Sequence, residues 1–171
     1  MKRALVTGAA ATLLWLVVAN SVPSKQARAA DWSHPKRIAT SNGITASYPR
    51  GWIARREAGP SLAFSSFALP ADWSFGDRKT IPEGGVFIWL YISGPRSTGF
   101  PERPGHFELR DEDHRFLSCG LGFEGWNVIF VDRSVTVQAF VGLGPGAGKS
   151  DAAELLDRLA IRRSSPSLAR T

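Results

Sequence analysis

The run from Val86 to Ile92 constrains the fold more than any other stretch of this 171-residue chain. Successive side chains of a β-strand point to opposite faces of its sheet. Apolar residues occupy both sets of alternating positions here: Val86, Ile88, Leu90 and Ile92 on one side, and Phe87, Trp89 and Tyr91 on the other. The run therefore predicts a strand in the middle of a sheet that is covered on both faces.

Further short apolar runs, separated by Pro and Gly, predict the other strands of the sheet. They are Ile44–Tyr48, Leu62–Phe67, Phe107–Leu109, Trp126–Val131 and Val135–Val141. The last two runs are joined tightly at Asp132-Arg133, which is typical of a hairpin. No internal repeat and no low-complexity tract interrupts this pattern.

One helix is predicted, from Asp151 to about Ile161. Asp151 can cap its start, with Glu154 in the capping-box position three residues later. Apolar residues then follow the spacing of a buried stripe, at Ala152, Leu155, Leu156, Leu159 and Ala160. The helix is expected to cover one face of the sheet, so the fold class is α+β, and the sequence does not show what covers the other face.

The first thirty residues resemble an export signal. Lys2 and Arg3 precede the uncharged stretch of residues 4–24, and the small-residue site Ala27-Arg28-Ala29 follows it. A basic start, an apolar middle and an A-x-A site are what signal peptidase recognises. We expect cleavage after Ala29 or Ala30 and a secreted or periplasmic protein. The alternative is a membrane anchor formed by residues 4–24, which are long enough to span a bilayer.

The expected organisation is a signal peptide over residues 1–29, a polar lead-in over 30–41, one globular domain over 42–163 and a disordered tail over 164–171. Residues 31–161 carry 14 basic and 15 acidic side chains, so the net charge of +6 belongs to the two ends of the chain. A nearly neutral domain gives no electrostatic reason to expect nucleic acid as a partner. Cys119 is the only cysteine, which excludes an internal disulfide.

The glycine-rich stretch from Gly142 to Ser150 resembles a phosphate-binding loop. The first glycine of that motif belongs at position 143, where this chain has Leu143. A nucleotide-binding sheet also needs several strands after the loop, and only about twenty residues remain. We therefore expect a strand-to-helix turn here, with no nucleotide and no other cofactor.

His106, Asp113 and His114 lie in the densest polar cluster of the chain and are weak candidates for a metal site. Their spacing matches no compact ligand motif, so a solvated turn is the simpler interpretation. Cys119 lies five residues after His114, but a Cys–His pair is reactive only when the two are held within hydrogen-bond reach. No hydrolase signature such as G-x-S-x-G or H-E-x-x-H is present.

Two long loops rich in Pro and Gly, residues 70–85 and 94–105, flank the central strand. Long loops on a rigid sheet often carry recognition. Trp73 offers an aromatic anchor, and Arg78, Arg96 and Arg103 offer guanidinium groups for an acidic partner. These four residues are the predicted ligand-binding set.

Three segments resemble the PsbP/Mog1-like superfamily. They are Ile44-Thr-Ala-Ser-Tyr-Pro-Arg-Gly-Trp52, Ile81-Pro-Glu-Gly-Gly-Val-Phe-Ile88, and the strand from Val135 followed by a glycine turn and Leu155-Leu-Asp-Arg-Leu159. The resemblance implies an α/β/α sandwich, in which an antiparallel sheet lies between helical layers. It carries over no catalytic residues, since members serve as accessory and binding modules.

The expected function is therefore a non-catalytic binding or accessory module of the cell envelope, with an unidentified protein or small molecule as its partner. Membrane contact is expected only if the leader is retained. The alternative is an envelope hydrolase or metal-dependent enzyme that uses His106, His114 and Asp113.

Overall fold

Two antiparallel sheets and one α-helix make up the part of the chain that the structure, a computed structural model, describes: residues 26–40, 43–57, 61–69, 81–117 and 123–161. The strands are β1 (Asp31–Ala39), β2 (Ile44–Arg50), β3 (Ile53–Arg56), β4 (Ser61–Ser65), β5 (Val86–Pro95), β6 (Arg115–Leu117), β7 (Phe123–Asp132), β8 (Val135–Leu143) and β9 (Leu159–Ile161). The helix is α1 (Lys149–Asp157), and a short 3₁₀ turn, η1, spans Asp111–Asp113.

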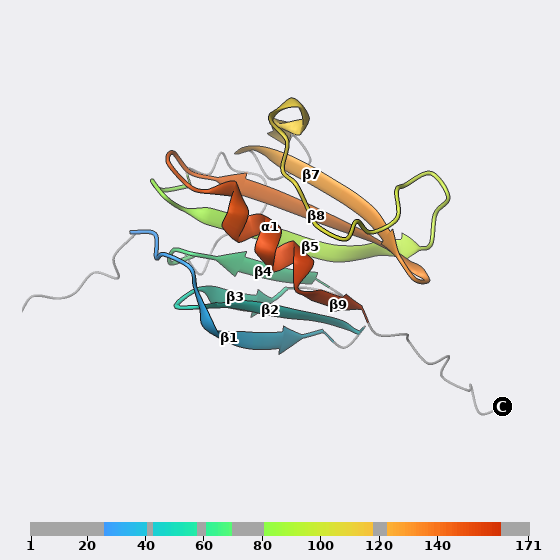
Figure 1. The fold of residues 1–171 in the computed structure, drawn as a ribbon, viewed down its shortest axis with the longest axis horizontal. Helices are drawn as coiled ribbons and strands as arrows, with labels where there is room; N and C mark the ends of the chain where they lie inside the picture. Colours follow the sequence, from blue (N-terminus) through green and yellow to red (C-terminus); the bar gives the residue numbers. More distant parts are fainter. Residues whose placement is uncertain (1–25, 41–42, 58–60, 70–80, 118–122, 162–171) are drawn as a thin grey trace, which may run out of the picture.

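The larger sheet has the strand order β3-β4-β5-β8-β7-β6, and the smaller one has the order β1-β2-β9 (Figure 1). Gly51, with φ of +90°, and Trp52 separate β2 from β3, so the chain passes from one sheet to the other at this turn. No helix in the described ranges is both long and apolar enough to cross a membrane.

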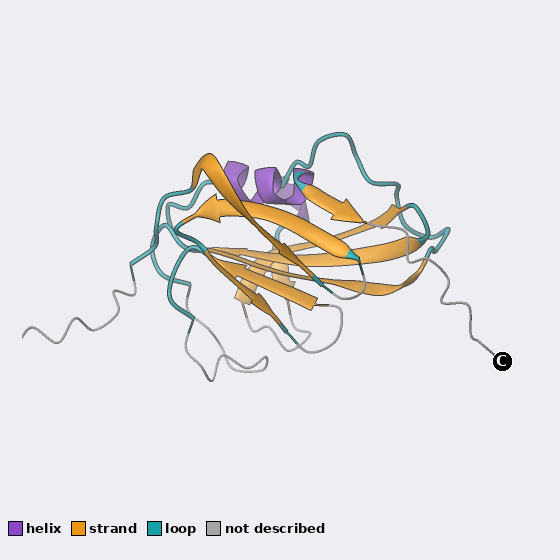
Figure 2. Ribbon diagram, turned by 90° about the horizontal axis from the view of Figure 1, so that it is seen from below, coloured by secondary structure: helices purple, strands orange, loops and turns teal. Residues whose placement is uncertain are grey.

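The predicted α/β/α sandwich is wrong, because the described part of the chain is mostly β and contains a single α-helix. The helical layers that the family resemblance implied are absent from the described residues. One face of the large sheet is instead covered by α1 together with the small sheet, both on the same side (Figure 2). The fold is thus a pair of packed sheets with one helix beside the smaller sheet.

The expected polar lead-in instead forms β1, which pairs with β2 and places Ile38 opposite Ala46. The hydrophobicity pattern did not predict this strand because most of its side chains are exposed, which is common for a strand at the edge of a sheet. Pro35 and a register irregularity between Asp31 and Lys36 also break its alternation. Such features are common in edge strands, where they discourage pairing with other chains.

The prediction for Val86–Ile92 is confirmed for the position of the strand in the middle of the sheet and for the cover of one face. On the other face Trp89 and Tyr91 are only partly buried. β5 lies between β4 and β8, with Ile88 paired to Phe64 on one side and to Val141 on the other. Val86, Ile88 and Leu90 face the main core, which they share with α1 and the small sheet. Phe87 belongs to a second cluster on the opposite face, where Trp89 and Tyr91 pack beside it.

The helix starts and ends earlier than its apolar stripe predicted. Gly148 is its N-cap residue, and Asp151 lies inside the first turn. After Asp157 the chain turns into β9, in which Leu159 and Ile161 pair with Ala46 and Ile44 of β2. Leu159 is buried in either arrangement, so the spacing of apolar residues alone could not distinguish helix from strand here.

The predicted β7–β8 hairpin is confirmed, with Asp132 paired to Val135 across a two-residue turn. Arg133 has a φ of 57° there. The predicted strand at Phe107–Leu109 does not form. Both residues are nevertheless buried in the main core, where they anchor residues 101–109, which we call the strap.

Candidate functional site

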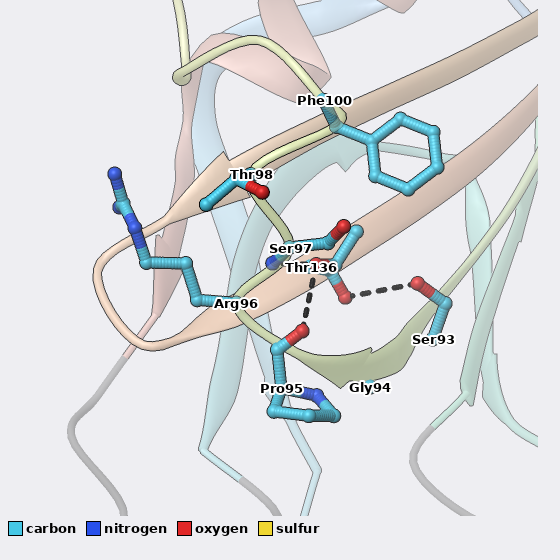
Figure 3. Close-up of a pocket in the computed structure, with 8 residues that line it drawn as sticks. All are labelled: Ser93, Gly94, Pro95, Arg96, Ser97, Thr98, Phe100 and Thr136. Carbon is cyan, nitrogen blue, oxygen red and sulfur yellow. Dashed lines mark hydrogen bonds between the residues drawn. The ribbon is translucent and has the colours of Figure 1, made fainter.

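The end of β5 and the loop after it form a pocket of about 530 Å³ (Figure 3). Its described lining comprises Ser93, Gly94, Pro95, Arg96, Ser97, Thr98, Phe100 and Thr136. We call residues 96–100 the recognition loop. The pocket lies in the second of the two loops that the sequence singled out.

Thr136 of β8 fixes the recognition loop to the sheet. Its hydroxyl donates to the carbonyl oxygen of Pro95 at 2.9 Å and accepts from the backbone N–H of Ser97 at 3.1 Å. The Ser93 hydroxyl donates to the carbonyl oxygen of Thr136 at 3.2 Å, and the Arg96 N–H donates to that of Ser134 at 2.8 Å. The loop is therefore held in one position by two central strands.

Phe100 is the exposed large hydrophobic side chain of the described residues, with 41% of its surface accessible. Its ring lies beside the hydroxyl-bearing residues of the pocket, while the Arg96 side chain extends away from it (Figure 3). The Arg96 guanidinium is paired with the Glu102 carboxylate and also donates to the carbonyl oxygen of Arg133 at 3.1 Å. The pocket thus combines an aromatic ring, small hydroxyls and a nearby exposed ion pair.

Arg103, another predicted ligand-binding residue, makes its contacts inside the protein. Its guanidinium donates to the Asp132 carboxylate at 2.9 Å and to the carbonyl oxygens of Leu156 and Asp157 at 3.1 and 2.9 Å. A cation at the last carbonyls of a helix satisfies acceptors that have no partner within the helix. Arg103 therefore ties the strap to the C-terminus of α1. Trp73 and Arg78 lie outside the described residues, as does Cys119.

The weak metal candidates lie near opposite ends of α1. His106 Nδ1 lies 2.5 Å from a carboxylate oxygen of Asp157, the last residue of the helix. His114 packs on Trp126, which the ammonium group of Lys149, the first helical residue, also covers. Among the described residues no group of three potential ligands could hold a metal ion. Asp113 lies beside Arg115, so the fold does not assemble the three candidates into one site.

The glycine-rich stretch from Gly142 to Ser150 is a close-packed turn. The N–H of Gly144 donates to the carbonyl oxygen of Gly85, and the N–H of Gly84 donates to that of Pro145, both at 2.7 Å. A Cβ on Gly144 would lie only 1.9 Å from the carbonyl oxygen of Pro82. Lys149 forms an ion pair with Asp111 at 2.5 Å. Gly144 therefore serves backbone packing, Gly146 has the positive φ of a turn, and the lysine is engaged with a carboxylate.

Within the described ranges, three carboxyl groups have shifted pKa values, and none of them lines the pocket. The hydrogen bond from Lys149 and its charge lower the pKa of Asp111. Hydrogen bonds from the side chain and backbone of Ser33 lower the pKa of Asp31. Burial raises the pKa of Asp151, and the nearby Glu154 adds to this effect. These shifts accompany local packing of β1 and of the N-terminal end of α1.

Sequence reasoning identified Arg96 but missed Phe100 and Thr136. Phe100 could have been singled out, because an aromatic residue between Gly99 and Pro101 in a long loop has little chance of burial in a strand or helix. The sequence does not distinguish Thr136 in this way, because threonine is common in β-strands. Its role depends on the register that places β8 beside the end of β5.

Comparison with known proteins gives no relative for this fold or this pocket: no protein-family model, curated protein or solved structure shows significant similarity to the chain.

Proposed function

We propose that the protein is an exported, non-catalytic binding module of the cell envelope, and that its partner contacts the recognition loop. The observation that carries this proposal is the pocket, where Phe100 is exposed on a loop fixed by Thr136. Exposed aromatic side chains held on a rigid support are typical anchors of recognition sites.

The chemistry of the lining favours binding over catalysis. The described lining residues supply hydroxyl groups, backbone and one arginine, with no histidine, carboxylate or thiol to activate a nucleophile. The hydroxyl groups of Ser93 and Thr136 already donate to carbonyl oxygens. We therefore expect a protein or small-molecule partner that packs on Phe100.

Site-specific photo-cross-linking tests the binding site. A photoreactive phenylalanine analogue at position 100 should give an adduct of defined mass in the envelope of the producing cell. The same analogue at Glu108, an exposed position on the strap, is the matched control. Adding Thr136→Val to the position-100 protein should reduce the adduct severalfold, because the loop loses two hydrogen bonds. Equal adducts at both positions would contradict the proposal.

Intact-mass measurement tests export. The protein recovered outside the cytoplasm should begin at Ala30 or Asp31, as the small-residue site predicts. Recovery of the uncleaved chain in the membrane fraction would support the anchor formed by residues 4–24 instead.

A further inference from the structure

The residues just before β1 run along the folded domain and form one wall of a groove. The N–H of Arg28 donates to the carbonyl oxygen of Ser66 at 2.8 Å, and its guanidinium donates to that of Gly51 at 3.0 Å. The methyl group of Ala27 approaches Gly84, at 3.7 Å from where a Cβ would stand. This is an ordinary van der Waals distance, and the φ of +67° at position 84 is what favours glycine there.

A cavity of about 550 Å³ lies at this place. The segment Gln26–Ala29 forms one part of its lining, and the turns at Glu83–Gly84 and Pro145–Gly146 form the other. The two turns are joined by the hydrogen bond from Gly84 to Pro145, so the receiving surface is built independently of the segment. Its one charged side chain is that of Glu83, which is exposed.

The segment that forms this wall contains the predicted peptidase site, Ala27-Arg28-Ala29. If export and cleavage proceed as proposed above, the segment leaves with the leader and the groove opens. Gln26, Arg28 and Ala29 are exposed, and the hydrogen bonds that hold the segment are few, so its removal leaves the core intact. The carbonyl oxygens of Ser66 and Gly51 then lose these donors.

We propose that the groove opened by processing binds an extended segment of a partner protein, in place of the removed wall, with the pattern small residue, arginine, small residue. The leader residues show which chemistry the groove accepts: a methyl group against Gly84, a backbone N–H to Ser66 and a guanidinium to Gly51. Glu83 adds a negative charge that favours a basic peptide. This inference rests on the proposed export and cleavage.

The test uses the processed protein purified after export, labelled with ¹⁵N and titrated with the amidated peptide Ser-Lys-Gln-Ala-Arg-Ala. The amide signals of Ser66, Gly84 and Gly146 should shift with peptide concentration, while that of Gly99 on the recognition loop should not. A peptide with alanine in place of the arginine should bind at least tenfold more weakly. Glu83→Gln in the protein should weaken binding severalfold.

A longer form of the protein provides the control. It is exported on an unrelated leader so that the mature chain starts at Gln26, and Arg28 should already occupy the carbonyl oxygens of Ser66 and Gly51. The peptide should then produce no shifts. Equal binding to both forms, equal binding of both peptides, or no shifts at millimolar peptide would each overturn the inference.

The two proposals fail in different ways. An exported protein that begins at Ala30 or Asp31 but gives no shifts refutes the peptide groove alone. A chain that is never cleaved refutes the processing step and therefore also the peptide-binding groove. The result of cross-linking at position 100 is independent of this outcome.

Discussion

Arg103 joins three parts of the molecule through one guanidinium group. It pairs with Asp132 at the end of β7 and donates to two carbonyl oxygens at the C-terminus of α1. Its backbone N–H donates to the carbonyl oxygen of Val131, which extends the edge of β7. Both side chains of the ion pair are largely buried, with 22% and 12% of their surface exposed.

Arg103→Ala should lower the free energy of unfolding by about 3 kcal/mol, because it leaves a largely buried carboxylate and two helix carbonyls without their donor. Urea denaturation measures this loss. Arg96→Ala is the matched control and should cost about 0.5 kcal/mol or less, since its ion pair with Glu102 is exposed. Equal losses for the two variants would show that Arg103 does not clamp the helix.

The carboxyl group of Asp151 should titrate above its usual pKa of 3.8, because burial disfavours its charged form. A folded-state pKa raised above the unfolded value stabilises the fold below the unfolded pKa. This stabilisation is lost as the pH rises through the raised folded pKa. As the pH rises from 3 to 7, the free energy of unfolding of Asp151→Asn should therefore increase relative to that of the wild type by up to about 0.5 kcal/mol. The difference is small because water still reaches the carboxyl group.

Carbon-13 NMR titration of the side-chain carboxyl groups checks the direction of this shift. Asp111, whose pKa the Lys149 ammonium lowers, provides the internal reference. A midpoint for Asp151 at or below that of Asp111 would contradict the assignment.

At the level of elements, the turn between β8 and α1 is fixed by backbone contact with the turn before β5. Gly144 and Gly85 are joined by one hydrogen bond, and Pro82 lies directly over the α-carbon of Gly144. This contact orients α1 relative to the central strands. It also explains the glycine-rich sequence without a phosphate ligand.

Gly144→Ala should lower the free energy of unfolding by about 3 kcal/mol, because the added methyl group collides with the backbone of Pro82 and one turn must move. The control is Gly105→Ala, where a Cβ meets nothing within 4 Å. Chemical denaturation of both variants gives the comparison. A Gly144 variant as stable as the Gly105 variant would mean that the two turns do not pack against each other in solution.

The central strands and the hairpin could be predicted from sequence because each is a short, nearly continuous apolar run bounded by turn residues. β9 could not, because Leu159 and Ile161 are buried by pairing with β2, a partner more than 100 residues away. The start of α1 was misplaced for a local reason. Asp151 resembles a cap, whereas the helix begins after Gly148, where no side chain caps it.

At the scale of the whole molecule, the arrangement of layers depends on pairings that no local pattern encodes. The strand β1 is mostly exposed and carries Pro35, so its sequence resembles a loop until β2 is placed beside it. The pocket also depends on strand pairing, because the register between β5 and β8 is what brings Thr136 within hydrogen-bond distance of Pro95. The family resemblance implied helical cover, but a second sheet supplies part of the cover instead.

This arrangement predicts a gradient of stability across the molecule. β5 and β8 lie in the middle of the large sheet, and Ile88, Leu90 and Ala139 are fully buried, so their amides should exchange hydrogen only through global unfolding. β1 is an exposed edge strand and should exchange through local opening, at least tenfold faster. Native-state hydrogen exchange in low denaturant measures both rates. If the amides of β5 opened together with those of β1, the two sheets would form one cooperative unit, and the small sheet would be as essential to stability as the central strands.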